Sequence, residues 1–258
     1  MCIALKGNVR FFLSQHKKEL TLNIIVYTII VMTIINFVNR QDELGYLNSS
    51  YAGRYFSFIS IIGRRRTGKT SLIEKFLSGK RASSYFLVPE VSDKDARSEL
   101  ARMLHESLKI SFLGEPSWDE IFEKIFSFSK DKKIILAIDE FQRLVRINKS
   151  VPSILQKHID RNHRNAKMML IVSGSSIGMM SSMFNHAAAL YGRRTGQIML
   201  DALDFEHLSE WFKEKRLRKL IEIYSVFGAT PRYLLEVDKR ESLIENIDRK
   251  ILSRNSIL

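Results

Sequence analysis

Residues Gly63 to Thr70 read Gly-Arg-Arg-Arg-Thr-Gly-Lys-Thr. A glycine, any four residues, Gly-Lys and a hydroxyl residue form the pattern of a phosphate-binding loop. The two glycines let the backbone turn tightly, so that its N–H groups point inward and make a nest for anionic oxygens. Lys69 then reaches the β- and γ-phosphates of a nucleotide, and the Thr70 hydroxyl is placed to ligate Mg²⁺.

The residues on either side supply the context that such a loop needs. An apolar, β-branched run over Phe56–Ile62 predicts a strand, and Ser71–Leu77 has its apolar residues at helical spacing. A helix that starts at the loop adds N–H donors and the positive end of its dipole. The alternative, a glycine-rich turn with incidental basic residues, is disfavoured by this strand–loop–helix order.

A second motif follows seventy residues later. The run Ile134-Ile-Leu-Ala-Ile-Asp-Glu140 is continuously apolar until it ends in two carboxylates, as a strand buried on both faces of a parallel sheet does. Ligands of open α/β sheets bind at the carboxyl ends of the strands. Asp139 is therefore expected to hold Mg²⁺, and Glu140 to orient and polarise an attacking water. A capped strand end with surface acids is the alternative for this motif taken alone.

The composition of the chain limits the kinds of partner that it is expected to bind. The chain has 258 residues, 45% of them hydrophobic, and a net charge of +13. Such an excess of cations favours contact with a polyanion, although a generally basic surface that serves solubility explains it equally well. The single cysteine, Cys2, fits a reducing compartment, and we expect the protein to be cytoplasmic.

The first 36 residues differ from the rest. Leu20–Val38 is an uncharged run of nearly the length that spans a bilayer, but threonine and asparagine dilute it. Three readings remain: an N-terminal anchor, a segment buried or bound by a partner, and an extension upstream of a true start at Met32. We favour the last, so a membrane partner is disfavoured without being excluded by residues 20–38.

Further elements are expected in an alternating order. A short helix over Asn39–Leu47, capped by Asn39, should turn Leu44 and Leu47 inward. Strands are predicted over 83–88 and 167–176, and a final strand within 190–200. Helices are predicted over 92–108, 117–129, 205–215, 217–227 and 242–252, with a short helix that starts at Pro231.

Two basic clusters leave their roles open. Segment 143–167 carries seven lysines and arginines against one acid, Asp160, and is either a DNA-contacting face or a solvated helix surface. His158 and His163 within it are spaced so that they do not share a helical face, which argues against a metal site. Arg193 and Arg194 either neutralise charge on a phosphoryl group, in cis or across a subunit boundary, or serve structure.

These motifs together resemble the archaeal ATPase family of AAA+/STAND-like P-loop NTPases. Five stretches carry the resemblance, and they are Phe37–Leu44, Gly63–Leu72, Ile138–Gln142, Leu190–Arg194 and Gly228–Leu234. The resemblance implies an α/β fold of the additional-strand type with a parallel sheet of order 5-1-4-3-2. It divides the chain into an unrelated extension (1–36), an ATPase core (37–203) and a small helical lid (204–258). Relatives usually continue into a further C-terminal domain, whereas this sequence ends at Leu258.

The resemblance also implies roles for individual residues. It makes Glu140 the catalytic carboxylate, Ser173 or Ser175 a polar sensor, and Pro231 a residue lining the base or sugar. The expected nucleotide contacts are Gly63, Arg64, Arg65, Arg66, Thr67, Gly68, Lys69, Thr70, Ser71, Ser173 and Pro231. Thr70 and Asp139 are the expected metal ligands, and Lys69, Glu140, Arg193 and Arg194 the expected catalytic residues.

The sequence thus predicts Mg²⁺-dependent ATP binding and hydrolysis. ATP rather than GTP is expected from the resemblance, and no guanine-reading Asn-Lys-x-Asp motif occurs. A slow nucleotide-gated switch and a DNA-associated binding module are the alternatives. A homo-oligomer or a protein partner fits each of them.

Overall fold

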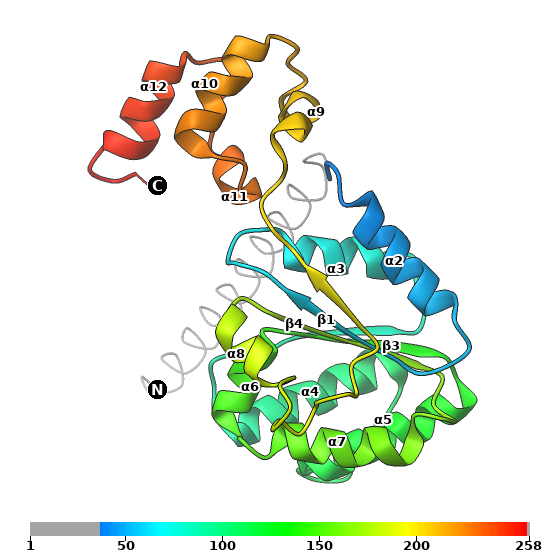
Figure 1. Cartoon of the computed structure of the whole chain (residues 1–258). Coiled ribbons are helices and arrows are strands. Elements are labelled where there is room, and N and C mark those ends of the chain that lie inside the picture. The colour runs from blue at the N-terminus through cyan, green and yellow to red at the C-terminus, as the bar shows by residue number, and fades with distance from the viewer. Residues whose placement is uncertain (1–36, 257–258) are drawn as a thin grey trace, which may run out of the picture. The chain divides into compact units, whose positions relative to one another are not determined.

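The computed structural model describes residues 37–256 (Figure 1), and the hypotheses about residues 1–36 fall outside them. Every element described below lies within residues 40–258, which form one unit of the chain. Within residues 37–256, no helix is both long and apolar enough to cross a membrane.

Five parallel strands form one sheet in the order β2-β3-β4-β1-β5. This is the predicted order 5-1-4-3-2 read from the other edge, so the α/β fold and its topology are confirmed. The strands are β1 (Ser57–Ile62), β2 (Ser83–Leu87), β3 (Ile134–Asp139), β4 (Met168–Gly174) and β5 (Gly196–Met199).

Helices cover both faces of this sheet. Figure 1 shows α2 and α3 on one face, and α4, α5 and α7 on the other. The helices before β5 are α2 (Gln41–Ala52), α3 (Lys69–Leu77), α4 (Asp93–Leu108), α5 (Trp118–Asp131), α6 (Phe141–Ile147), α7 (Val151–Asn162) and α8 (Ile177–Ser182). Because both faces are covered, every residue of β3 and β4 is buried, as their continuous apolar runs predicted.

Local signals start most of these helices where the sequence predicts. The Ser92 side chain accepts a hydrogen bond from the Asp95 N–H at the start of α4, and Ser117 and Glu120 form a reciprocal capping box at the start of α5. The predicted Asn39 cap is wrong. The residue before α2 is Arg40, in the left-handed region with φ 70° and without a side-chain cap, and it pairs with Glu43 at 3.0 Å.

Short helices follow β5. They are the 3₁₀-helix η1 (Phe205–His207), α9 (Leu208–Phe212), α10 (Leu217–Phe227), α11 (Pro231–Leu234), α12 (Leu243–Ile247) and the π-helix η2 (Asp248–Leu252). The predicted bounds of α10 and the start of α11 are confirmed. The helix predicted over 205–215 ends earlier, because Lys213 takes a left-handed conformation. That the ATPase core ends at residue 203 and a lid begins at 204 stays a prediction.

Aromatic rings contact one another in the core beside α5. Phe126 is 1% exposed, and its ring lies 5.8 Å from that of Phe56 and 6.1 Å from the imidazole of His158. Replacing it by alanine removes these contacts and leaves a cavity.

We expect Phe126→Ala to lower the free energy of unfolding by ~3–5 kcal/mol, measured by urea denaturation. Leu113→Ala is the matched control, because Leu113 is 96% exposed and should change the stability by less than ~0.5 kcal/mol. Equal effects of the two substitutions would contradict the core assigned here.

Candidate functional site

The loop between β1 and α3 is shaped by its backbone. Arg66 and Gly68 both have positive φ, at 72° and 95°, and α3 begins directly after Gly68. Gly63 lies against the end of β5, where a Cβ on it would stand 2.2 Å from the carbonyl oxygen of Leu200. Gly63 is therefore required for the close approach of two backbones, whereas Gly68 is the glycine of this loop whose positive φ favours glycine.

Lys69 is held over this loop. Its Nζ donates to the carbonyl oxygens of Gly63 and Arg64, at 2.9 and 2.8 Å, and the residue is buried. Burial lowers the pKa of Lys69, while the carboxylates of Glu140 and Asp139 oppose that shift. The loop thus presents one ammonium group close to two carboxylates, at the edge of the sheet where the strands end.

The carboxylate of Asp139 gathers donors from three other elements. It is 1% exposed and accepts from the hydroxyls of Thr70 at 2.7 Å and Tyr85 at 2.8 Å. Ser173, at the end of β4, donates to its other oxygen. The backbone N–H of Glu140 donates to that same oxygen at 2.9 Å, so both oxygens are engaged.

Glu140 follows directly and is held in a different way. Its backbone is left-handed, with φ 58°, which is uncommon for a residue with a side chain. One carboxylate oxygen accepts from Ser175 at 3.0 Å and from the side-chain amide of Gln142. The guanidinium of Arg143 lies 3.8 Å from that same oxygen.

Several side chains of this site were not predicted. Gln142 and Arg143 contact Glu140, and Tyr85 contacts Asp139. Burial, followed by the charge and hydrogen bond of Asp139, raises the pKa of Tyr85, and burial raises the pKa of Glu74 on α3. The one signal for Tyr85 is its position near the carboxyl end of a strand that neighbours β3.

The structure does not bring Arg193 and Arg194 to this site. Both precede β5, which runs parallel to β1, so they lie at the opposite edge of the sheet. Arg193 pairs with Asp160 at 2.9 Å. Arg194 donates to Ser60 at 3.1 Å and stacks on Phe184. Because Ser60 lies about 10 Å along β1 from Gly63, neither arginine reaches the loop of its own chain.

Segment 143–167 is divided between two edges. Arg143, on α6, lies beside Glu140, whereas Arg164 and Lys167 precede β4 at the other end of α7. Lys157 pairs with Asp119 at 2.5 Å, and His158 contacts the same carboxylate at 2.7 Å. The cations of this segment therefore do not form one face.

The segment that contains Pro231 approaches the loop through a neighbour. Pro231 is the first residue of α11, and the Tyr233 ring on that helix lies 5.4 Å from the guanidinium carbon of Arg66. This cation–π contact links the phosphate-binding loop to α11.

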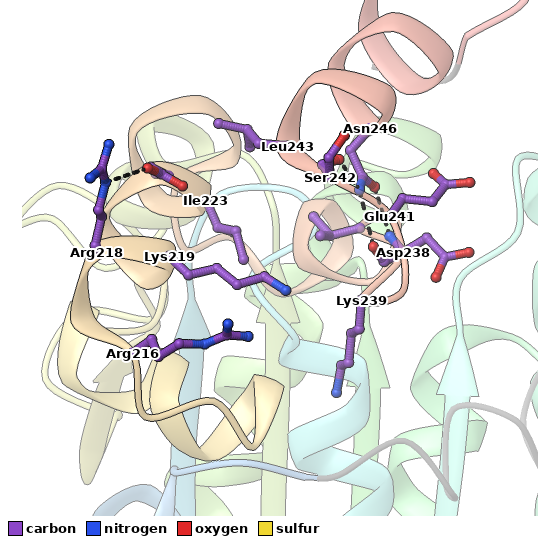
Figure 2. Close-up of a pocket in the computed structure, with 12 residues that line it drawn as sticks. Arg216, Arg218, Lys219, Ile223, Asp238, Lys239, Glu241, Ser242, Leu243 and Asn246 are labelled. Carbon is purple, nitrogen blue, oxygen red and sulfur yellow. Dashed lines mark hydrogen bonds and ion pairs between the residues drawn. The ribbon is translucent and has the colours of Figure 1, made fainter.

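A pocket of about 390 Å³ lies within the helices after β5 (Figure 2). Its lining comes only from residues 216–246, and its charges are largely matched. Arg240 pairs with Asp238 at 3.0 Å, and Arg218 pairs with Glu222 at 3.1 Å. No residue of the phosphate-binding loop lines this pocket, so it is separate from the site around Asp139.

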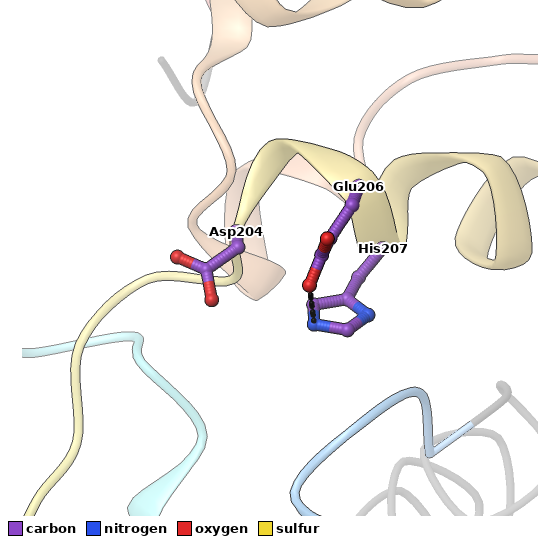
Figure 3. Close-up of side chains that lie close together, drawn as sticks. All are labelled: Asp204, Glu206 and His207. Carbon is purple, nitrogen blue, oxygen red and sulfur yellow. Dashed lines mark ion pairs between the residues drawn. The ribbon is translucent and has the colours of Figure 1, made fainter.

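Asp204, Glu206 and His207 place one possible metal-ligand atom each within 4.8 Å of the others (Figure 3). The two acids are exposed, and His207 lies 3.5 Å from Glu206. Exposed acidic groups of this kind are common without a metal, and we assign this cluster no role.

Comparison with known proteins gives one family match. The model of an ATPase domain found predominantly in Archaea matches residues 37–237. An uncharacterised protein of Methanocaldococcus jannaschii is 37% identical over 202 residues, which cover 78% of this chain and 44% of that protein. The chain therefore spans less than half the length of this relative. An uncharacterised ATP-binding protein of the same organism is 46% identical over 48 residues, or 19% of this chain and 81% of that protein.

Solved structures share the fold at low identity. A Walker-type ATPase of Pyrococcus abyssi has a TM-score of 0.62 at 19% identity, over 82% of this chain and 72% of that one. The ORC2 protein of Aeropyrum pernix, in ADPNP–ADP complexes, has a TM-score of 0.56 at 15% identity, over 78% and 62%. A STAND protein of Pyrococcus horikoshii with a tetratricopeptide repeat sensor has a TM-score of 0.54 at 18% identity, over 82% and 32%.

The tight contact at Gly63 yields a stability prediction. We expect Gly63→Ala to lower the free energy of unfolding by ~1–3 kcal/mol, because its Cβ would overlap the Leu200 carbonyl oxygen. Gly45→Ala, within α2 and with open space around its Cβ, should instead raise it by ~0.5–1 kcal/mol. Urea denaturation of both variants checks this, and a stabilising Gly63→Ala would refute the packing described.

Proposed function

Because the chain belongs to the family of ATPase domains found predominantly in Archaea, we propose that it binds ATP with Mg²⁺ and hydrolyses the bond between the β- and γ-phosphates. The observation that carries this proposal is the meeting of Lys69, Thr70, Asp139 and Glu140 at one edge of the sheet. One fold relative was solved in ADPNP–ADP complexes, which supports nucleotide as the ligand.

Nucleotide binding is assigned to the loop and the start of α3. The backbone from Gly63 to Ser71 offers N–H groups at a helix N-terminus, which favours phosphate oxygens. Lys69 already holds its ammonium against the loop carbonyls, so it needs only a small movement to reach a phosphate. Arg64, Arg65 and Arg66 are exposed on the loop and add positive charge at its rim.

Thr70 and Asp139 fit a magnesium ion. A hydroxyl and a carboxylate are oxygen ligands of the kind that Mg²⁺ prefers, and their oxygens are 2.7 Å apart. Tyr85 and Ser173 fix the orientation of the carboxylate. A magnesium ion bound by these residues would neutralise charge on the phosphate oxygens. Ser173 thus acts through Asp139 in this proposal, and Ser175 through Glu140.

Glu140 is the proposed acceptor for the attacking water. It directly follows Asp139 and lies close enough to Lys69 to influence its pKa. Its carboxylate would orient the water and accept a proton from it as the water oxygen approaches the γ-phosphorus. Most of the acceleration would come from positioning and charge stabilisation, because phosphoryl transfer asks little covalent chemistry of a protein.

The remaining predicted residues receive narrower roles. Pro231 lies two residues from Tyr233, which contacts Arg66, and this contact supports the proposal that α11 lines the base or sugar. A contribution of Arg193 or Arg194 to hydrolysis requires a neighbouring copy, because both lie at the far edge of their own sheet. That role therefore depends on homo-oligomer formation.

A slow nucleotide-gated switch is the second candidate. The observation that favours it is the Glu140 carboxylate, which is bonded to Ser175 and Gln142. These bonds hold one carboxylate oxygen in place, and turnover would be slow if this fixed orientation keeps the second oxygen from the attacking water. In this reading ATP rearranges α11 against the loop, and hydrolysis only resets it.

Lys69→Ala should effectively abolish ATP binding, with the Kd raised by roughly 100-fold or more, because the charge facing the phosphates is lost. Isothermal titration calorimetry with Mg²⁺–ATP measures this. Lys75→Ala on the exposed side of α3 is the matched control and should bind as wild type does. Tight ATP binding by Lys69→Ala would contradict the assignment of nucleotide binding to this loop.

Glu140→Gln should bind ATP normally but lose turnover by roughly 10²- to 10⁴-fold, because an amide cannot accept the proton. Phosphate release under single-turnover conditions measures this, with Glu99→Gln on the exposed face of α4 as control. If wild type and Glu140→Gln bind ATP tightly and hydrolyse it at the same slow rate, the switch is correct and Glu140 is not catalytic.

A further inference from the structure

The amino edge of the sheet, where the five strands begin, is unusually basic. We define it by the segments that lead into the strands, residues 53–56, 78–82, 132–133, 163–167 and 183–195. These segments contain nine lysines and arginines and no aspartate or glutamate. The nine are Arg54, Lys80, Arg81, Lys132, Lys133, Arg164, Lys167, Arg193 and Arg194.

The opposite edge does not share this charge. The segments that leave the strands, residues 63–68, 88–92, 140, 175–176 and 200–204, contain three arginines and four carboxylates. Because all five strands are parallel, the two sets of segments lie at opposite ends of the sheet, and β1 and β5 can both be followed from one to the other in Figure 1. Much of the +13 net charge is therefore gathered away from the nucleotide site.

Structure accounts for some of these cations. Lys133 donates to the carbonyl oxygen of Gly53 at 2.9 Å, and Lys80 to that of Phe76 at 2.7 Å, as cations near helix C-termini do. Arg193 and Arg194 are engaged by Asp160 and Ser60.

Other cations at this edge make no such interactions. Among the described residues, the side chains of Arg54, Arg81, Arg164 and Lys167 have no hydrogen-bond or ion-pair partner. All four are exposed. Like charges gathered without partners repel one another, so an external anion is the group that would satisfy them.

Aromatic rings stand among these cations. A cavity of about 770 Å³ opens at this edge, lined among others by Tyr55, His163, Arg164, Tyr191 and Arg193. Tyr55 is 79% exposed and Tyr191 is 40% exposed. A ring as exposed as Tyr55 adds little to the core, and its faces are open to another planar group.

We propose that the amino edge binds single-stranded nucleic acid, with Arg164 and Lys167 on its phosphates and an unpaired base stacked on Tyr55. Basic grooves that carry accessible aromatic rings are suited to this ligand, because every base has a face that can stack. Paired bases in a duplex keep their faces covered, so a duplex would use the cations without the ring. This site does not depend on the proposed ATP chemistry.

The charge is tested with the full chain and a fluorescent single strand of about 20 nucleotides, by anisotropy at low salt. R164E/K167E should weaken binding at least ~10-fold and lower the salt slope of log K by about 1.4, the value for two lost phosphate contacts. K213E/K215E is the matched control, because it reverses two exposed charges outside this edge. Equal weakening by both pairs would show only a general charge effect and would overturn the proposal.

The ring is tested separately. Tyr55→Ala should weaken binding of the single strand by roughly 5- to 100-fold, whereas Tyr55→Phe should bind as wild type does, because it keeps the stacking face. Thermal unfolding and ATP binding should be unchanged in these variants, which checks that the fold is intact. Binding that is insensitive to Tyr55→Ala would overturn the single-strand assignment.

Two competing ligands complete the experiment. A duplex of the same length should bind more weakly than the single strand and should not respond to Tyr55→Ala. Phosphatidylserine vesicles should not compete with the oligonucleotide. Preference for the duplex, capture by the vesicles, or no nucleic-acid binding at low salt would each overturn the proposal.

Discussion

The buried carboxylate of Asp139 constrains everything around it. A carboxylate withdrawn from water costs several kcal/mol unless it is fully hydrogen-bonded, and this one is 1% exposed. Its donors come from α3, β2, β4 and the following backbone N–H. The same bonds that orient this proposed metal ligand therefore also tie α3 and the neighbouring strands to β3.

All five strands run in the same direction, and this determines at which edge of the sheet each side chain lies. Residues that follow a strand arrive at one edge, and those that precede a strand arrive at the other. This rule brings Thr70, Asp139, Glu140 and Ser175 together, although they come from distant parts of the sequence. It also removes Arg194 to the far edge. A residue next to a strand in the sequence is therefore not necessarily a site residue. It reaches the site only if it lies at the end of the strand that faces the site.

The parts of the structure that were predictable have strong local causes. Short local patterns predict the loop at Gly63 and the strands β3 and β4. The strand order was predicted from the family resemblance. The failures have non-local causes. Tyr85 joins the site only because β2 lies beside β3, and Gln142 only because α6 turns back toward β4. The start of α2 after Arg40 depends on a left-handed backbone at that residue, which its residue type does not favour.

The surroundings of Glu140 bear on the choice between the two proposed functions, ATP hydrolysis and a slow nucleotide-gated switch. The side-chain amide of Gln142 donates hydrogen bonds to Glu140 and Ser175, while its carbonyl oxygen is buried without a hydrogen-bond partner. An unsatisfied buried acceptor costs about 1–3 kcal/mol, and an arrangement that gives this oxygen a donor would recover that energy at the expense of the bond to Glu140. A ligand that binds one of two such arrangements more tightly shifts the population toward it. In the proposed function, a nucleotide that draws Glu140 toward a water would release Gln142, and the strength of that coupling would influence the rate of hydrolysis.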